Sequence, residues 1–320
     1  MKKSGQSVFY SEGNWYKRNL HTHTTRSDGK SSVEEILTGY KKSGYDFISI
    51  TDHLIYEDYQ HLNESNFITI PGTEIHFRHP KSAVHINFIL GTDEMIKEGK
   101  GEKIAKSERY PLLETQGDLR VIQKVIDDMC SRGFIAIINH PAWSYMEPQE
   151  IADLHGFTAI EAYNSGCGVY ANTGYANIFW DNLLRRGINM WGVAADDTHT
   201  FHPLGDYCSE AYRGWIMVKA ASLTRNDIMK AILDGSFYAT QGPEIHEFEI
   251  KDGHVVFRCS PVEKIYFAKG KGPALGKLSS QNVDTLTEFE YKLKGDELYV
   301  RGECIDSKGR RAYTNPIFLK

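Results

Sequence analysis

Two alternating histidines stand near the start of the chain, in the segment NLHTHTTRSDGK at residues 19–30. Side chains of an extended segment repeat with a period of two, so His21 and His23 would point to the same side. Two imidazoles on one face, followed by Asp28, are side chains of the kinds that bind a divalent metal ion. An exposed strand without any metal would show the same short pattern, so the rest of the chain must decide.

Further residues of metal-ligand type end several short apolar runs. They are Asp52 and His53 after FISIT, Glu74 after FITIPGT, His140 after FIAIIN, Glu161 after FTAI, and Asp196, Asp197 and His199 after WGVAA, with His85 inside the run AVHINFIL. In a closed β/α barrel the carboxyl ends of the strands open on one rim, where such enzymes carry their chemistry. Residues spread over the first two thirds of the chain are therefore expected to converge on one metal site.

The elements that would position them are repeated helix-to-strand units. In SSVEEILTGYKKSG, Ser32 and Glu35 form a capping-box pattern and Gly44 supplies a stop, and the apolar run YDFISI follows. The same order recurs in DLRVIQKVIDDMCSRG before FIAIINH, and in NIFWDNLLRRG before INMWGVAADDTH. Repeated units of this kind predict a parallel sheet covered by helices.

The pattern changes near residue 243. From there short strands alternate with Gly, Asp and Lys turns, and helical periodicity is absent. We expect a metallohydrolase-type barrel over residues 1–242 and a small β-sandwich-like domain over residues 243–320. Residues 91–117 are polar and weakly periodic, which indicates a mobile surface insertion near the rim.

Composition limits the possible partners. The formal net charge is −5, which provides no basic surface for duplex nucleic acid. No signal-peptide pattern and no long apolar stretch is present, so we expect a cytoplasmic protein that does not contact membranes. The 5 cysteines are widely spaced without a CxxC, which argues against a disulfide framework and a thiolate zinc site.

The motifs HTHTTRSDG, ITDH, GTE, NHP and DDTH occur in the order found in the PHP (polymerase and histidinol phosphatase) superfamily, which this chain resembles over residues 19–240. The segments WDNLLRRG, GVAADDTH, YRGWIMVKA and GRRAYTNPIFL further resemble the carbaryl-hydrolase-like CehA/McbA group. The resemblance implies a distorted (β/α)₇ TIM-like barrel with a trinuclear metal centre at its rim.

The resemblance also implies a ligand set. His21, His23 and Asp197 would hold the first ion, Glu74 would bridge to a second ion held by His85 and His140, and Asp28, His53 and His199 would hold the third. Asp196 is the alternative to Asp197 as the ligand of the DxH motif. We expect Asp197 to bind the ion and Asp196 to support the ligands without binding it. Independently of the family, imidazole and carboxylate ligands suit two to three divalent ions of manganese, zinc or iron.

The chemistry expected of such a site is hydrolysis through a metal-bound hydroxide. Three carboxylates offset half of the charge of three divalent ions, so the site would attract a phosphate group. Glu74 would take part in catalysis by bridging two of the ions. A proton donor is still needed near the leaving oxygen, and His199, Asp52 and a metal-bound water are the candidates.

Several other residues allow more than one interpretation of their role. Arg26, Arg213 and Lys219 could pair with substrate phosphate or be solvated charges. Trp143 and Tyr145 could line the pocket, whereas Trp180 and Trp191 are predicted to be core residues. Glu161 and Asn164 could orient ligands, touch substrate or cap a loop. His76 and His79 belong to the segment HFRHP, which is interpreted as a polar loop. Asp52 could orient a ligand without binding metal. The remaining histidines read as surface or structural residues: His61, His155, His202, His246 and His254.

The sequence therefore predicts a metal-dependent phosphoesterase that acts on a small phosphorylated molecule, either a phosphomonoester or a short nucleotide. Two alternatives remain open. One is a carboxyl or carbamate ester hydrolase using the same ions, because one kind of site can serve several reactions. The other is a non-catalytic regulatory module that binds metal. The sequence does not determine the oligomeric state.

Overall fold

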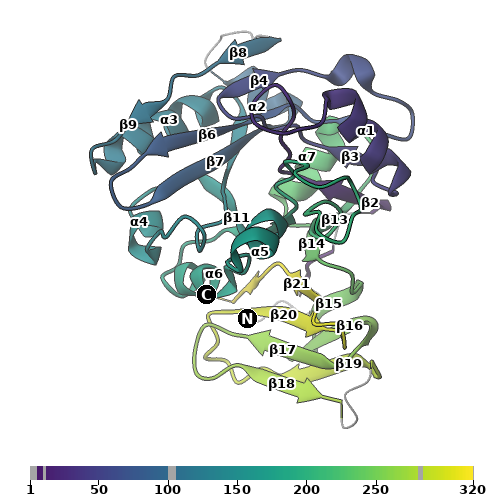
Figure 1. Ribbon diagram of the computed structural model, residues 1–320. Helices are drawn as coiled ribbons and strands as arrows, with labels where there is room; N and C mark the ends of the chain where they lie inside the picture. Colours follow the sequence, from purple (N-terminus) through teal and green to yellow (C-terminus); the bar gives the residue numbers. More distant parts are fainter. Residues whose placement is uncertain (1–5, 10–11, 100–105, 280–283, 320) are drawn as a thin grey trace.

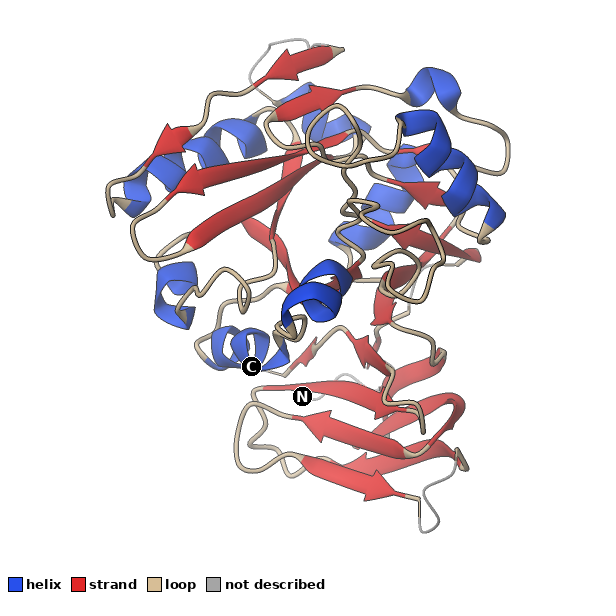
Figure 2. Cartoon of the chain, in the orientation of Figure 1, coloured by secondary structure: helices blue, strands red, loops and turns tan. Residues whose placement is uncertain are grey.

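The computed structural model describes residues 6–9, 12–99, 106–279 and 284–319. The chain is a mixed α/β protein. Helices lie in one part of the molecule, and beyond them is a part built from strands of the C-terminal region (Figures 1 and 2). No helix among the described residues is long and apolar enough to cross a membrane.

A six-stranded sheet positions five of the nine predicted ligands. Its strands, in spatial order, are β12 (Trp191–Ala195), β11 (Phe157–Asn164), β10 (Phe134–Ile138), β7 (Ala83–Leu90), β6 (Gly72–Arg78) and β9 (Leu113–Glu114). β10, β11 and β12 are parallel, as predicted. The prediction of a parallel sheet is wrong at β7, which runs antiparallel to both β6 and β10. The reason is the connection of four residues, 79–82, which is too short for a crossover and permits only a hairpin.

A second sheet carries the remaining ligands and continues into the C-terminal region. Its strands, in spatial order, are β18 (Leu275–Leu278), β17 (Lys264–Ala268), β20 (Tyr299–Ile305), β21 (Arg311–Thr314), β14 (Phe237–Thr240), β13 (Trp215–Ala220), β2 (Asn14–Asn19), β3 (Phe47–Ile48) and β5 (Ile68–Thr69), with β22 (Ile317–Phe318) paired to β20. β2, β3 and β5 are parallel, whereas β13 is antiparallel to β2. The parallel prediction is therefore wrong here too, because β13 enters the sheet between two antiparallel neighbours.

The helices of the described residues are α1 (Val33–Lys42), α2 (Asp93–Glu98), α3 (Leu119–Ser131), α4 (Pro148–Ala152), α5 (Ser165–Ala171), α6 (Asn177–Arg185) and α7 (Arg225–Leu233), with a 3₁₀ turn at Gln60–Leu62. Three helices, α1, α3 and α6, lie where the apolar periodicity predicts them, whereas the other four were not predicted. The predicted capping box at Ser32 and Glu35 is confirmed, and Gly44 follows α1 with a φ of +75°. Helix α3 buries Ile122, Ile126 and Met129 against the sheet.

The C-terminal strands enclose a core of their own. A four-stranded sheet consists of β1 (Gln6–Ser7), β15 (Ile245–Lys251), β16 (His254–Val262) and β19 (Leu286–Lys292). Phe248 and Phe257 from this sheet pack against Phe267 of β17. Val8 and Phe9 belong to the same core, and β14 pairs with β21, so the chain crosses the predicted boundary at residues 242/243 in both directions. The two-domain division itself stays a prediction.

The predicted insertion at residues 91–117 carries short regular elements. These are α2, β8 (Ser107–Arg109) and β9, and β8 pairs with β4 (Ile55–Glu57). Residues 100–105 of this segment lie outside the described residues. Its mobility stays a prediction.

The connection between β19 and β20 is organised by the buried carboxylate of Glu297. This carboxylate accepts hydrogen bonds from the Tyr291 hydroxyl (2.8 Å) and from the backbone N–H groups of Lys294 (2.7 Å) and Gly295 (2.8 Å). Burial raises the pKa of Glu297, but the hydrogen bonds to the charged form outweigh burial and lower the pKa to about 2. A lowered folded-state pKa means that the stabilisation is present above the ordinary pKa of about 4.5 and is lost as the pH falls towards 2.

The loss of this stabilisation, at most about 3 kcal/mol, can be measured as melting temperature against pH. We expect the wild type to lose melting temperature more steeply than Glu297→Gln between about pH 5 and pH 3, because the amide does not titrate. Equal slopes for the two proteins would contradict this role of Glu297.

Candidate metal centre

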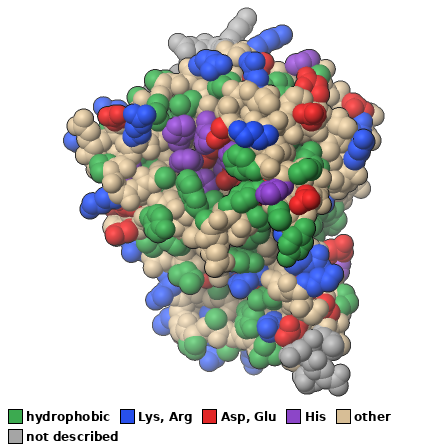
Figure 3. Space-filling model, viewed as in Figure 1, with side chains coloured by type: hydrophobic (Ala, Val, Ile, Leu, Met, Phe, Trp, Pro, Cys, Tyr) green, Lys and Arg blue, Asp and Glu red, His purple; other side chains and the backbone are tan. Residues whose placement is uncertain are grey.

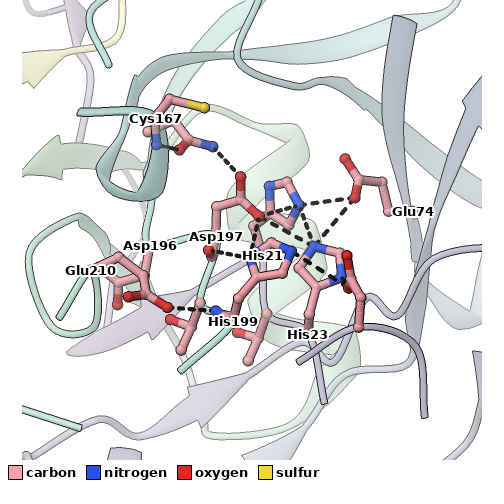
Figure 4. A network of polar contacts seen from close by, with 12 residues as sticks. His21, His23, Glu74, Cys167, Asp196, Asp197, His199 and Glu210 are labelled. Atoms are coloured by element: carbon pink, nitrogen blue, oxygen red, sulfur yellow. Dashed lines mark hydrogen bonds and ion pairs between the residues drawn. The ribbon is translucent and has the colours of Figure 1, made fainter. Parts of the chain in front are cut away.

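The predicted ligands come together at one end of the two sheets. His21, His23 and Asp28 follow β2, His53 follows β3, Glu74 and His85 lie in β6 and β7, His140 follows β10, and Asp197 and His199 follow β12. Figure 4 shows His21, His23, Glu74, Asp197 and His199 pointing toward one another from separate segments. All nine residues belong to groups whose ligand atoms lie within 4.8 Å of one another.

The centre of the cluster is the carboxylate of Glu74. Its Oε2 atom lies 3.3 Å from His21 Nε2, 3.2 Å from His23 Nε2 and 3.0 Å from His53 Nδ1. Oε2 is buried and has no hydrogen-bond partner among the described residues. Burying a carboxylate oxygen without a hydrogen-bond donor costs free energy, unless the oxygen binds another partner such as a metal ion.

The two histidines of the HxH motif face each other across a short gap. His21 Nε2 and His23 Nε2 are 3.1 Å apart, and Asp197 Oδ1 lies 3.1 Å and 3.2 Å from them. Two ligand atoms that each lie about 2.1 Å from one ion are separated by about 3 Å. The spacing and the donor set therefore fit a divalent metal ion held by His21, His23, Glu74 and Asp197.

The other ligand atoms extend the cluster on two sides. On one side, Glu74 Oε1 lies 3.0 Å from His85 Nδ1 and 3.5 Å from His140 Nε2. On the other side, Asp28 lies 3.5 Å from His199 Nε2, 3.6 Å from His23 Nδ1 and 3.7 Å from His53 Nε2.

The grouping of these ligands differs in part from the set that the resemblance implies. His140 lies in a group with His21 and Asp197, whereas His85 lies in a group with Glu74 and His53. The number of ions and the division of ligands among them stay proposals.

Charge within the cluster favours a bound cation. Burial alone would raise the pKa values of Glu74 and Asp197, but the surrounding histidines hold both well below the usual range. Burial alone would lower the pKa of His199, but Asp28 and Asp197 raise it to about 9. The carboxylates therefore stay ionised, and His21, His23 and His199, whose pKa values are raised, attract protons that a metal ion would replace. At His85, by contrast, burial lowers the pKa to about 4 and leaves its lone pair available at neutral pH.

The backbone at the ligand turns is strained. His140, Asp197, Thr200 and Leu54, which follows His53, all have positive φ values, between 25° and 58°. Residues other than glycine rarely adopt this conformation, and such strain of about 1–3 kcal/mol persists where the surrounding structure enforces it. Its concentration at three of the ligand motifs supports a functional role for these turns.

Several predicted residues support the ligands from behind. Glu161 contacts His21 Nδ1 at 2.7 Å and accepts a hydrogen bond from the His140 backbone N–H at 2.9 Å. The Asn164 amide donates to Glu161 (2.8 Å) and to Asp197 (3.2 Å), so both residues hold ligands in place. Asp52 is bound by Thr24 and by the Ser27 hydroxyl, and does not line the cavity described below.

The two aspartates of the DDTH motif take separate places. Asp197 lies in the cluster, whereas the Asp196 carboxylate accepts hydrogen bonds from the backbone N–H groups of Tyr212, Arg213 and Gly214 and from the Tyr40 hydroxyl. Asp196 thereby anchors the loop between β12 and β13.

That loop carries a second buried carboxylate, Glu210, which was not predicted from the sequence. Its Oε1 accepts from the backbone N–H groups of His199 (2.5 Å) and Thr200 (2.7 Å), and its Oε2 accepts from the Tyr170 hydroxyl (2.7 Å). Figure 4 shows Glu210 beside His199 on the side away from Glu74. No local motif marks Glu210, because its partners lie 10 and 11 residues earlier in the same loop and 40 residues earlier in α5.

The predicted loop position of His76 is also wrong. The segment HFRHP was interpreted as a loop, but residues 76–78 belong to β6, and His76 Nδ1 lies 3.1 Å from His53 Nδ1. His79 lies in the hairpin, where its Nδ1 contacts the Ser82 hydroxyl at 3.1 Å. The alternation of Glu74, His76 and Arg78 in a strand was the signal that could have placed His76 on the side of the ligands.

A cavity of about 490 Å³ opens over the cluster. In Figure 3 the histidines gather in one hollow of the surface, with hydrophobic side chains at its edge. Its aromatic walls are Trp143, Tyr170 and Phe201, and Phe201 stacks on the His199 ring at a centroid distance of 5.4 Å. Among the described residues, no lysine or arginine lines it.

The basic residues proposed for substrate lie elsewhere. Arg26 pairs with Glu57 at 2.7 Å, the Arg213 side chain bonds the Tyr207 carbonyl, and Lys219 lies near the Trp15 ring. None of the three lines the cavity over the cluster.

Removing the charge of Glu161 is expected to weaken metal binding. Glu161→Gln should lower metal affinity about 10–100-fold, because the residue orients two ligand histidines without binding the ion itself. The measurement is competition with a chelating dye, and Glu98→Gln on the exposed face of α2 is the matched control. Equal affinities of the two variants would contradict this role.

No family model and no curated protein matches the chain. The solved structures to which the chain is similar include a two-domain protein from Bacteroides vulgatus containing a predicted PHP-like metal-dependent phosphoesterase (15% identity, TM-score 0.49, covering 99% of this chain and 100% of that one). Others are PsfC from Pseudomonas syringae (14%, 0.41, 69% and 88%) and a metal-dependent phosphoesterase from Bifidobacterium adolescentis (15%, 0.37, 68% and 95%).

Proposed function

We propose that this chain is a metal-dependent hydrolase that cleaves a phosphoester of a small molecule. The observation that carries the proposal is the convergence of six histidines and three carboxylates around Glu74, whose buried Oε2 atom has no hydrogen-bond partner among the described residues. Three carboxylates cannot neutralise two or three divalent ions completely, so an anionic substrate is favoured at this place. We further propose the distorted seven-stranded PHP barrel as the fold, since β12 approaches β13 and β14, and two residues join β5 to β6.

Bound divalent ions would polarise water at neutral pH and offset charge on the phosphoryl group. The protein would contribute orientation and a boundary to solvent. Glu74, His21 and His23 would hold the ions, and Glu161 would fix the ring of His21. Asp52 does not line the cavity, so the proposed proton donor is His199 or a water molecule.

A specific observation supports a second candidate, the hydrolysis of an aryl carboxyl or carbamate ester. The cavity has three aromatic walls and no lysine or arginine among its described lining residues. An aromatic leaving group would pack against such walls, whereas phosphate binding would depend on the ions alone.

The test is turnover by the manganese-reconstituted protein on a panel of phosphomonoesters, nucleotides and aryl carboxyl or carbamate esters, with His21→Ala as control. Metal-dependent release of phosphate supports the phosphoesterase. Ester cleavage without phosphate release replaces it with the second candidate. Metal binding without turnover of any substrate would favour a regulatory module.

A further inference from the structure

A second cavity, of about 590 Å³, adjoins the one over the metal cluster. Trp143 lines both cavities and therefore lies between them. The second cavity is bounded by the β6–β7 hairpin, by the turn at residues 143–145 and by residues at the end of α5. Tyr145, which was expected at the metal site, lines only this second cavity.

The two cavities differ in charge. The first is lined by Asp28, Glu74 and Asp197 together with histidines. The second is lined by Arg78 and Lys81, and no aspartate or glutamate is among its described lining residues. His79 also lines it, and because its Nδ1 accepts from the Lys81 backbone N–H at 3.4 Å, its Nε2 carries the ring proton and is available as a donor.

The path of β6 connects the two cavities. Glu74, His76 and Arg78 alternate along this strand and therefore lie on one face of the sheet. Four residues of strand span about 13 Å, which sets the separation between the cluster and the Arg78 position. Arg78 pairs with Glu114 at 3.1 Å, but both side chains are more than half exposed, so this pair can be exchanged for a bound anion at little cost.

We propose that the cavity of Arg78, His79, Lys81 and Ser82 binds a second anionic group of an elongated substrate, a phosphate or a carboxylate. The scissile ester would lie at the metal cluster, and the middle of the substrate would pass Trp143. This inference rests on the proposed hydrolase function for its kinetic test, but the binding of the anion itself does not require turnover.

The kinetic test compares α,ω-alkanediol bisphosphates of increasing length with the matching monophosphates. The wild type should show a KM about tenfold lower for the bisphosphate that spans the two cavities. The double variant Arg78→Ala/Lys81→Ala should lose this advantage, with kcat and the KM for monophosphates unchanged. Arg120→Ala is the matched control, because Arg120 is likewise an exposed arginine paired with an acidic residue. The ω-carboxylated monophosphates form a parallel series that distinguishes the two anions.

Equal KM values for bisphosphates and monophosphates in the wild type would overturn the proposal, and so would an advantage that survives in the double variant. A second measurement separates this failure from failure of the hydrolase assignment. It is calorimetric binding of a non-hydrolysable bisphosphonate of the same length to the metal-free protein. Affinity that falls about tenfold in the double variant supports the cavity even if no ester is cleaved. Unchanged affinity overturns it even if phosphoesters are hydrolysed.

Discussion

Glu74→Gln is expected to lose most of the bound metal and to lower kcat/KM by at least about 10³. The carboxylate contacts His21, His23 and His53 through Oε2 and His85 through Oε1, so it reaches ligands on both sides of the cluster. Gln is neutral, and the lone pair of its amide nitrogen is delocalised into the carbonyl, so it offers an ion only one oxygen. Losing several kcal/mol of metal-derived stabilisation corresponds to about three powers of ten in rate.

Metal content by mass spectrometry and turnover of the same preparation are the two measurements. Glu98→Gln, on the exposed face of α2, is the control for the substitution itself. A circular dichroism spectrum equal to that of the wild type shows that the variant is folded. A folded Glu74→Gln protein with full metal content and full turnover would refute the assignment of the metal centre.

Glu210→Ala is expected to lower the free energy of unfolding by about 3 kcal/mol and kcat/KM by about 10². The substitution leaves the buried N–H groups of His199 and Thr200 and the hydroxyl of Tyr170 without their acceptor. The turn that carries His199 would shift, and a displacement of about 1 Å at a reacting centre can cost a factor of about 10².

The measurements are denaturant unfolding and turnover, with two further variants. Glu210→Gln keeps one oxygen for the two N–H groups and should be affected less. Tyr170→Phe removes only one hydrogen bond, so its stability loss should be about 0.5–1.5 kcal/mol. If Glu210→Ala and Tyr170→Phe behave alike, the bonds to the His199 turn contribute nothing and the proposed role of Glu210 fails.

Local sequence was sufficient for helices α1, α3 and α6 and for the residue types at the site. The capping box at Ser32 and the apolar stripe of α3 depend on neighbours within one or two turns, so they can be read from spacing alone. The direction of β7 and β13 was misjudged, because apolar strands look alike whichever way they run. Only the short hairpin at residues 79–82 carried a signal for the antiparallel pair.

The sequence by itself determined the chemistry available to this protein: six histidines and three carboxylates at or near strand ends, which suit divalent metal ions. The tertiary structure decided which atoms meet. It placed His76 beside His53, Glu210 behind His199, and Trp143 between two cavities of unlike charge. The physical reason is distance along the chain. A ligand type follows from one residue, whereas a buried hydrogen bond or a pocket wall requires segments far apart in sequence to pack together, and local patterns carry no information about that packing.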